Sequence, residues 1–504
     1  MIDDNYEQLS LFEDNLLNKI ITKPVRLISF FSGIESQYKA LKIISDYTKL
    51  PVESYKTCEW AYNSIIACNA IHNRDFIDYS ANKSKEEMIN AIRGISINYN
   101  EPLSDEKLNR KPLNWIKTAY NSCIANHNLI NIMNVKGRDL EIKETDKYEY
   151  IITYSYPCQD LSLAGKRAGM SISQADGGTR SGLLWEVERI IQECHDLGYD
   201  NMPQVLIMEN VPQVHSSKDL PYFVKWIERL NELGYTSYYE DLNASDYGIP
   251  QNRERCFMIS ILNSKDGKEY KYNFPKSIEL KLTLKNLLEN NVSENYYLSQ
   301  KMIDYLTGIN QFESKYNRTE VFMRNLDPKK EIACTITTAS GQRATDNFII
   351  EDDLTKIEYI PIRNANKKGY LEAHDGDGIN IGGRMQYQRG NVQEGKCQTL
   401  KTSIDVGVCL FEGYGSNDTR DIPNLNGFRI RKLTEKECMR LMGFQDKDVD
   451  NMKEAGLTKT AIVHCAGDSI VVTVLIAIFA KLYGLKNSEI NTVINSYINT
   501  IKEG

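Results

Sequence analysis

The sequence contains no pair of cysteines at the CxxC spacing, although it has 11 cysteines in 504 residues. The missing spacing argues against a zinc ribbon, and the odd number of cysteines argues against a disulfide framework. Free thiols in this number are typical of a reducing compartment. We therefore expect a cytoplasmic protein without a structural metal site.

We also expect no leader and no membrane segment. The acidic stretch at 1–17 lacks the apolar core of a signal peptide. The longest apolar run, IVVTVLIAIFA at 470–480, is too short to cross a bilayer, so we expect a buried helix and no membrane contact. A large positive charge is absent as well. Because the net charge is −7, any binding of nucleic acid must use a local basic groove.

Strand-like and helix-like segments alternate through the first half of the chain. The strands are expected at 27–31, 55–60, 148–156, 204–211 and 254–262, and the helices from 37, from 61, at 182–198 and at 222–235. This alternation predicts an open, mostly parallel α/β sheet.

The composition changes near residue 270. From there to about 425 the chain is rich in Asn, Gly, Thr and Asp and has only short β-like pieces, which predicts a separate loop-rich domain. Next, 431–444 predicts a helix with Thr434 at the N-cap and Glu437 at the third position, the spacing of a capping box. A further apolar helix, at 466–484, is suited to pack against the first sheet.

These patterns divide the chain into a first α/β domain at 24–268, a smaller loop-rich domain at 270–428, and a segment at 429–504 that returns to the first domain. Residues 74–130 form a long insert with helix-like pieces. Its basic residues are interspersed with acids, so we favour a solvated helical cap over a DNA-contacting element.

Three chemically useful residues stand at the ends of predicted strands. They are Glu59, Cys158 just behind Pro157, and Glu209. Each alone has an ordinary interpretation, as a surface carboxylate or a buried thiol. Ligands of open α/β sheets bind beyond the carboxyl ends of the strands, so one rim would bring together a thiol and two acids.

A series of motifs gives this rim a more specific interpretation. FSGIES, CEW, YPCQDLS, GTRSGLLWEVER, MENV, QNRER, RKLTEKECMRLMGF and AGDSIVV occur in that order. The series resembles the DNA (cytosine-5) methyltransferase family of bacteria and phages, over about 25–265 and 428–484. The resemblance implies a Rossmann-like catalytic domain that binds S-adenosylmethionine and, in the loop-rich domain, a target-recognition domain for double-stranded DNA.

The resemblance also assigns catalytic roles. Cys158 would add to carbon 6 of cytosine, which makes carbon 5 nucleophilic enough to take a methyl group. Glu209 would supply or share a proton at ring nitrogen N3. Arg255 would stabilise charge on the ring carbonyl, and Arg253 would hold the loop or a phosphate nearby.

The implied cofactor is S-adenosyl-L-methionine. Glu59 would bind the ribose hydroxyls, Trp60 would stack on the adenine, and Asp139 would meet the adenine amino group. Its other implied contacts are Phe31, Gly33, Ile34, Pro157, Leu183, Asp468 and Ser469.

A stacked cytosine cannot reach a thiol, so the target base must be flipped out of the duplex. The segment 159–182 resembles the family's mobile loop, with Gln159 and Ser162 near the flipped base and Arg180 near a phosphate. In the target-recognition domain, Thr399 resembles the threonine that grips the backbone, and Thr335 is the competing match. The best local basic stretch of that domain holds Arg384, Arg389, Lys396 and Lys401.

The chain departs from the family pattern at two positions. Glu35 stands where the first motif usually has a second glycine, and Asp468 stands where the last motif usually has asparagine. Either change is expected to alter cofactor affinity. The 80 residues between Glu59 and Asp139 are also a long spacing for the family, because of the insert.

Rival interpretations remain open at this point. One is a tRNA cytosine-5 methyltransferase, and another is a catalytically inert DNA-binding homologue. A dehydrogenase that uses NAD is disfavoured because it leaves the PCQ, ENV and QxRxR motifs unexplained. We expect action as a monomer on duplex DNA, in restriction–modification or phage DNA protection, with a cognate restriction endonuclease as a candidate partner.

Overall fold

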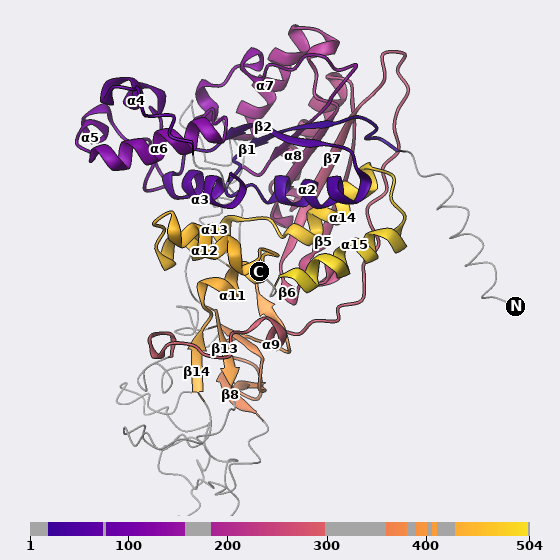
Figure 1. Ribbon diagram of the computed structural model, residues 1–504. Helices are drawn as coiled ribbons and strands as arrows, with labels where there is room; N and C mark the ends of the chain where they lie inside the picture. Colours follow the sequence, from indigo (N-terminus) through magenta and orange to yellow (C-terminus); the bar gives the residue numbers. More distant parts are fainter. Residues whose placement is uncertain are drawn as a thin grey trace, which may run out of the picture. The chain divides into compact units, whose positions relative to one another are not determined.

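The computed structural model describes residues 19–73, 77–156, 183–297, 359–380, 390–400, 406–410 and 429–501 (Figure 1). The chain divides into two compact units. The first consists of Met1–Ile249, Glu254–Glu279 and Met442–Gly504, and the second of Pro250–Arg253 and Leu280–Leu441.

A six-stranded sheet forms the centre of the first unit. Its order is β2-β1-β3-β4-β7-β5. The strands are β1 (Val25–Phe30), β2 (Val52–Cys58), β3 (Glu149–Tyr154), β4 (Val205–Asn210), β5 (Tyr235–Asn243) and β7 (Glu254–Leu262). β2, β1, β3 and β4 run parallel, whereas β7 is antiparallel to both of its neighbours. The predicted mostly parallel α/β fold is confirmed.

One strand of this sheet, β5, was not predicted. Gly234, with φ of 88°, turns the chain directly from the preceding helix into Tyr235. The strand lies at the edge of the sheet and is buried mainly at its two ends. Its mixed run of tyrosines and acids therefore shows no continuous apolar pattern, which is the signal that marks a central strand.

Helices cover both faces of the sheet. They are α2 (Ser36–Thr48), α3 (Tyr62–His72), α7 (Leu184–Asp196), α8 (Leu220–Glu232), α14 (Val472–Leu482) and α15 (Asn487–Thr500). α7 and α8 pack on one face, where the indole of Trp226 donates a hydrogen bond to the Tyr154 hydroxyl at 3.1 Å. In Figure 1, α7 lies above the strands, and α2, α14 and α15 lie together below them.

The insert is a small helical layer with its own core. Its helices are α4 (Lys85–Ala91), α5 (Asp105–Asn109) and α6 (Leu113–Ala125), at one end of the sheet in Figure 1. Ser84 and Glu87 form a capping box at the start of α4. Met88, Leu108 and Ile116 are buried together in a cluster of their own.

The apolar segment near the C-terminus differs from the single helix expected at 466–484. It forms two helices, α13 (Lys459–Asp468) and α14, which follow α12 (Asp446–Glu454). Ser469 takes an extended conformation, and its hydroxyl donates back to the Cys465 carbonyl at 2.6 Å, so the helix stops there. The span Lys459–Leu482 is apolar and long enough to cross a membrane, but 83% of its most apolar window is buried inside the protein, as in a core helix.

The second unit is built from short strands. A four-stranded sheet has the order β11-β10-β13-β14, and two further pairs are β8-β9 and β12-β6. The strands are β6 (Gln251–Asn252), β8 (Ile360–Arg363), β9 (Tyr370–Ala373), β10 (Gly378–Asn380), β11 (Val392–Gln393), β12 (Cys397–Gln398), β13 (Val406–Leu410) and β14 (Arg429–Lys432), and the helices are α9 (Leu284–Leu287) and α11 (Glu435–Arg440). The capping box predicted for Thr434 and Glu437 is confirmed at the start of α11.

Candidate cofactor and catalytic site

A tight turn follows β1 and shapes the first part of the candidate site. Phe31, Gly33 and Glu35 all adopt positive φ angles, of 53°, 54° and 57°. The Gly33 amide donates to Glu59 Oε2 at 2.9 Å, which joins the ends of β1 and β2. No atom lies within 4 Å of a Cβ built on Gly33, so the turn faces open space. Such a turn lets a ligand approach the backbone closely.

Glu59 is held from several sides. Its Oε1 accepts from the Ala61 amide at 2.7 Å, and Asn128 bonds both its backbone amide and its carbonyl, at 3.0 and 2.9 Å. Desolvation raises the pKa of Glu59, the two backbone bonds oppose that shift, and the charge of Asp468 adds to it. A partly buried carboxylate beside an open turn suits hydroxyl donors such as those of a ribose.

The other predicted cofactor contacts in this unit differ in burial. Ile34 and Leu183 are buried, at 2% and 7% exposure. Phe31 packs against the main core cluster, whereas Trp60 packs against the core of the insert. The Trp60 ring is therefore partly used in packing, and its stacking on an adenine stays a prediction.

Asp468 and Ser469 occupy the break between α13 and α14. Asp468 is the last residue of α13, and its Oδ2 lies 3.0 Å from Nδ1 of His464. Ser469 is buried and caps the end of the same helix. Asp139 differs from them, because its carboxylate accepts from the Lys136 amide at 2.9 Å within its own turn. Its contact with the cofactor stays a prediction.

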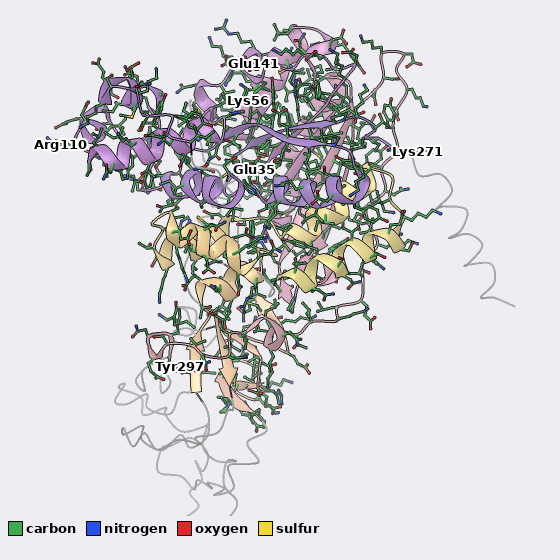
Figure 2. The ribbon with its side chains drawn as sticks, in the orientation of Figure 1. Glu35, Lys56, Arg110, Glu141, Lys271 and Tyr297 are labelled. Atoms are coloured by element: carbon green, nitrogen blue, oxygen red, sulfur yellow. The ribbon has the colours of Figure 1, made fainter. Side chains whose placement is uncertain are left out.

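Glu35, the departure in the first motif, lies in the interior of the first unit (Figure 2). It is 1% exposed, and its carboxylate accepts from Ser54 at 2.7 and 2.9 Å and from Ser29 at 3.3 Å. Desolvation raises the pKa of Glu35 to about 7, despite these hydrogen bonds. The side chain therefore fills space behind the cofactor turn and leaves the turn itself open.

The two candidate groups for ring activation form an ion pair. Arg255 Nε lies 3.1 Å from Glu209 Oε1, and both side chains are largely buried. Glu209 stands opposite Phe257 across the β4–β7 ladder. Arg255 is two residues before Phe257, so it faces the same side of the sheet. The positions of these residues in MENV and QNRER thus produce the pair directly.

Asn210 links this pair to the strand end that precedes Cys158. Its amide donates to the Tyr156 carbonyl at 3.1 Å, and its oxygen accepts from the Val211 amide at 2.9 Å. Cys158 lies two residues beyond Tyr156. The predicted site residues that fall outside the described part of the chain are Pro157, Cys158, Gln159, Ser162 and Arg180.

Arg253 and Thr399 belong to the second unit and join two neighbouring stretches of chain, 251–253 and 397–400. Cys397 and Gln398 pair in parallel with Gln251 and Asn252. Arg253 is 5% exposed and donates from Nη1 to the Leu400 carbonyl at 3.0 Å, while Thr399 donates to the Asn252 carbonyl at 2.6 Å. Thr335, the competing match, lies outside the described residues, as do Arg384, Arg389 and Lys401.

Sequence reasoning missed Asn128, Asn210 and His464. Asn210 carried a usable signal, since it directly follows Glu209 in the ENV motif. Asn128 is 69 residues from Glu59 and belongs to no motif, so only the fold reveals its role. His464 lies one helical turn before Asp468, a spacing that places both on one face of α13.

Two groups of potential metal ligands occur among the described residues. They are Glu35, Cys68 and His72, and His215, Asp241 and Cys256. Burial raises the pKa of both thiols. In the second group, His215 already bonds Asp241 through Nε2 at 2.9 Å. In the first group, Cys68 Sγ donates to Glu35 Oε2 at 3.8 Å.

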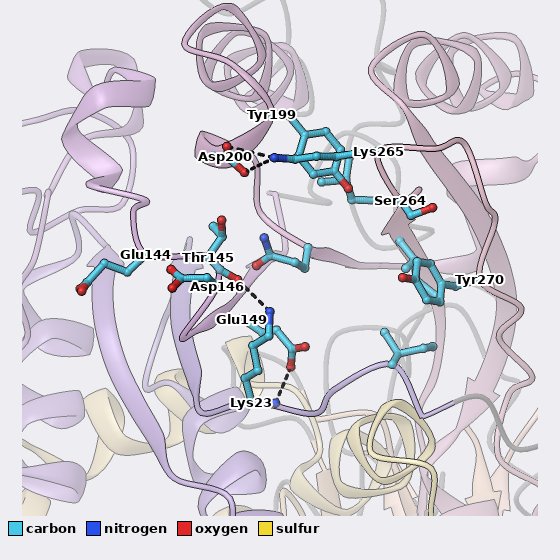
Figure 3. Close-up of a pocket in the computed structure, with 14 residues that line it drawn as sticks. Lys23, Glu144, Thr145, Asp146, Glu149, Tyr199, Asp200, Ser264, Lys265 and Tyr270 are labelled. Atoms are coloured by element: carbon cyan, nitrogen blue, oxygen red, sulfur yellow. Dashed lines mark hydrogen bonds and ion pairs between the residues drawn. The ribbon is translucent and has the colours of Figure 1, made fainter.

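A cavity of about 710 Å³ opens at the opposite rim of the sheet (Figure 3). It is bordered by Glu149 and Gln204, at the amino ends of β3 and β4. Lys23 donates to the Thr145 carbonyl at 2.8 Å, and Lys265 pairs with Asp200 at 2.8 Å. Because it lies away from the carboxyl ends of the strands, this cavity is not the candidate site.

Comparison with known proteins identifies the family. The family model "C-5 cytosine-specific DNA methylase" matches residues 86–484. The chain is 30% identical over 468 residues to the orphan methyltransferase M.SssI of Spiroplasma monobiae, across 92% of this chain and 98% of that protein. It is 33% identical over 281 residues to the type II methyltransferase M2.ScrFI of Lactococcus lactis subsp. cremoris. That alignment covers 55% of this chain and 71% of M2.ScrFI. A solved structure of the Entamoeba histolytica methyltransferase EhMeth matches with a TM-score of 0.46 and 16% identity, and the match covers 92% of this chain and 98% of the EhMeth chain. The chain therefore belongs to the family of C-5 cytosine-specific DNA methylases.

Proposed function

We propose that this protein transfers a methyl group from S-adenosyl-L-methionine to carbon 5 of a flipped cytosine in a specific sequence of duplex DNA. The observation that carries the proposal is the Glu209–Arg255 pair at 3.1 Å, at the strand ends of the same unit that holds the turn around Gly33. Family membership supports the reaction, and the pair supports how the ring is activated.

Cys158 is the proposed nucleophile. Its thiolate adds to carbon 6 of the ring and forms an S–C6 bond, which leaves carbon 5 with enamine character. The sulfonium cofactor supplies the methyl group that carbon 5 takes. Loss of the carbon-5 proton to water then expels the thiolate and restores the aromatic ring. Asn210 supports this role because it fixes the carbonyl of Tyr156, two residues before the thiol.

Glu209 is the proposed proton donor at N3. Its ion pair with Arg255 favours the ionised carboxylate while no base is bound. The entering ring would compete for Arg255 through its carbonyl oxygen, where negative charge develops during addition. A shift of the guanidinium toward that oxygen weakens its ion pair with the carboxylate, so Glu209 can take up a proton from water and pass it to N3.

The proposed cofactor site uses the open turn after β1 and the acids beside it. Glu59 would accept from the ribose hydroxyls, and Trp60 would cover the adenine. Asp468 and Ser469 would close the site from the C-terminal side. The open space at Gly33 and the raised pKa of the partly buried Glu59 carboxylate both favour a ligand that donates hydrogen bonds there.

We assign DNA contacts in the second unit to the segment around Thr399. Arg253 holds this segment through the Leu400 carbonyl, which favours its loop-holding role over a phosphate contact. Action as a monomer in the cytoplasm, and DNA protection beside a cognate restriction endonuclease, complete the proposal. Protection would be undermined if DNA methylated by this enzyme were cut by every tested nuclease as readily as unmodified DNA.

Bisulfite sequencing of plasmid DNA from cells that express the wild-type chain or Cys158→Ala tests the reaction. We expect 5-methylcytosine in one short sequence context with the wild type and none with the variant. Thermal unfolding and cofactor binding of Cys158→Ala serve as controls for folding. Persistent methylation by Cys158→Ala would refute the nucleophile, and unmarked DNA with methylated tRNA would refute the substrate.

A further inference from the structure

Backbone hydrogen bonds join the insert to the chain just after β2, next to Glu59. The Ser96 amide donates to the Trp60 carbonyl at 2.7 Å, and the Tyr62 amide donates to the Ser96 carbonyl at 2.9 Å. Ser96 is fully buried, and the ring of Tyr62 stacks on Trp115 with centroids 4.3 Å apart. The chain just beyond Glu59 is therefore fixed by the insert.

The surface of the insert gives little reason to expect DNA on it. Four of the seven basic side chains described at 77–130 are paired with acids, among them Arg93 with Asp105 at 3.0 Å and Lys107 with Glu101 at 4.0 Å. The other two pairs join Lys83 to Glu87 and Arg110 to Glu106. A surface with compensated charges attracts phosphates weakly. We therefore infer the role of the insert from its contacts with the chain after β2 and with α13.

A short loop carries the insert across to α13. We call residues 96–101 the Tyr99 loop. Asn98 Oδ1 accepts from the amides of Asn100 and Glu101 at 3.1 and 3.2 Å, and the Ser96 hydroxyl donates to the Glu101 carbonyl at 2.7 Å. These bonds close the loop and hold Tyr99 at a φ of 61°. Side chains other than glycine rarely adopt that conformation without such support.

Tyr99 stacks on His464. The ring centroids are 4.1 Å apart and the planes differ by 15°. His464 in turn lies 3.0 Å from the Asp468 carboxylate, on the same face of α13. Burial raises the pKa of Tyr99, and the nearby Cys465, Asp468 and Glu59 raise it further.

We propose that Tyr99 is a positioning residue for the cofactor, acting through the His464 ring on Asp468. The inference rests on the proposed cofactor roles of Glu59 and Asp468. The insert binds the chain beside one acid through Ser96 and reaches the other through the Tyr99–His464 stack. The insert thereby sets the distance between Glu59 and Asp468, which are about 400 residues apart in the sequence.

Isothermal titration of S-adenosylmethionine into the full chain tests this role. Tyr99→Ala is expected to weaken binding about fivefold, the scale of one aromatic stacking pair. Tyr99→Phe keeps the ring and should bind like the wild type. Ile97→Ala is the matched control, because Ile97 is an exposed neighbour in the same loop, at 38% exposure. Initial rates should show a raised cofactor KM for Tyr99→Ala, with kcat at saturating cofactor and the KM for DNA unchanged.

A second variant, His464→Ala, keeps the test decisive if Tyr99→Ala does not fold. His464→Ala removes the other half of the stack, so it should weaken binding by a similar factor, and the double variant should lose little more than either single one. Wild-type affinity in both single variants would overturn the inference, as would a Tyr99→Phe that binds as weakly as Tyr99→Ala. A wild-type chain that binds no S-adenosylmethionine would instead overturn the proposed function.

Discussion

Arg255 and Glu209 meet at 3.1 Å across two antiparallel strands. They come from motifs 46 residues apart and are the two charged groups best placed to act on one ring. An arginine beside a general acid opposes protonation of that acid until substrate arrives. In the proposed mechanism, the pair would therefore link proton donation by Glu209 to binding of the base.

Glu209→Gln tests the proton donor. The amide cannot hand a proton to N3, so we expect kcat to fall by about 10²- to 10⁴-fold, the usual contribution of general acid catalysis. The matched control is Glu240→Gln, because Glu240 faces the same Phe257 from the other neighbouring strand. Single-turnover methylation of a short duplex measures both variants. Equal rates for the two would show that Glu209 is not the acid.

Much of this site could be predicted from sequence because its residues lie at strand ends. Glu59 and Glu209 follow recognisable strands, so their places on one rim come from the general geometry of open α/β sheets. The edge strand β5 could not be found, because half-exposed strands lack a continuous apolar run. The break at Ser469 was missed for the opposite reason, since the apolar pattern continues through it.

The supporting contacts were beyond sequence reasoning. Asn128 is hydrogen-bonded to Glu59, 69 residues away in the sequence. Tyr99 stacks on His464, 365 residues away. Neither pair has a periodicity or a motif that would join its members. Each depends on how the insert folds back on the end of β2, where Trp60 packs against the core of the insert.

Asn128→Ala is expected to make the position of Glu59 in the proposed cofactor site less fixed. The variant removes two hydrogen bonds that hold the backbone of Glu59. At about 1 kcal/mol for each bond, cofactor affinity should fall by roughly 30-fold. Titration with S-adenosylmethionine measures the change, and Asn114→Ala, at an exposed position of α6, is the control. Unchanged affinity would mean that Glu59 keeps its place without Asn128.

Thr399 offers a test of the DNA contact in the second unit. Its hydroxyl donates to the Asn252 carbonyl at 2.6 Å, next to Arg253. Thr399→Ala should weaken binding of a cognate duplex by about fivefold, near the cost of one hydrogen bond. Thr399→Ser retains the hydroxyl and should restore most of the affinity. Cofactor binding should stay constant in both, and a loss shared by Ala and Ser would argue for packing by the methyl group instead.

Glu35 makes stability depend on pH in a predictable direction. Its pKa is raised from 4.5 to about 7 in the folded protein, so the folded state binds more protons than the unfolded chain between these values. Stability is therefore fully present below about pH 4.5 and falls as the pH rises toward 7, by roughly 3 kcal/mol in total. Glu35→Gln should remove this dependence, whereas the exposed Glu53→Gln should keep it. Urea unfolding at pH 5, 6, 7 and 8 measures the slopes, and parallel slopes for wild type and Glu35→Gln would show that Glu35 is ionised throughout the range.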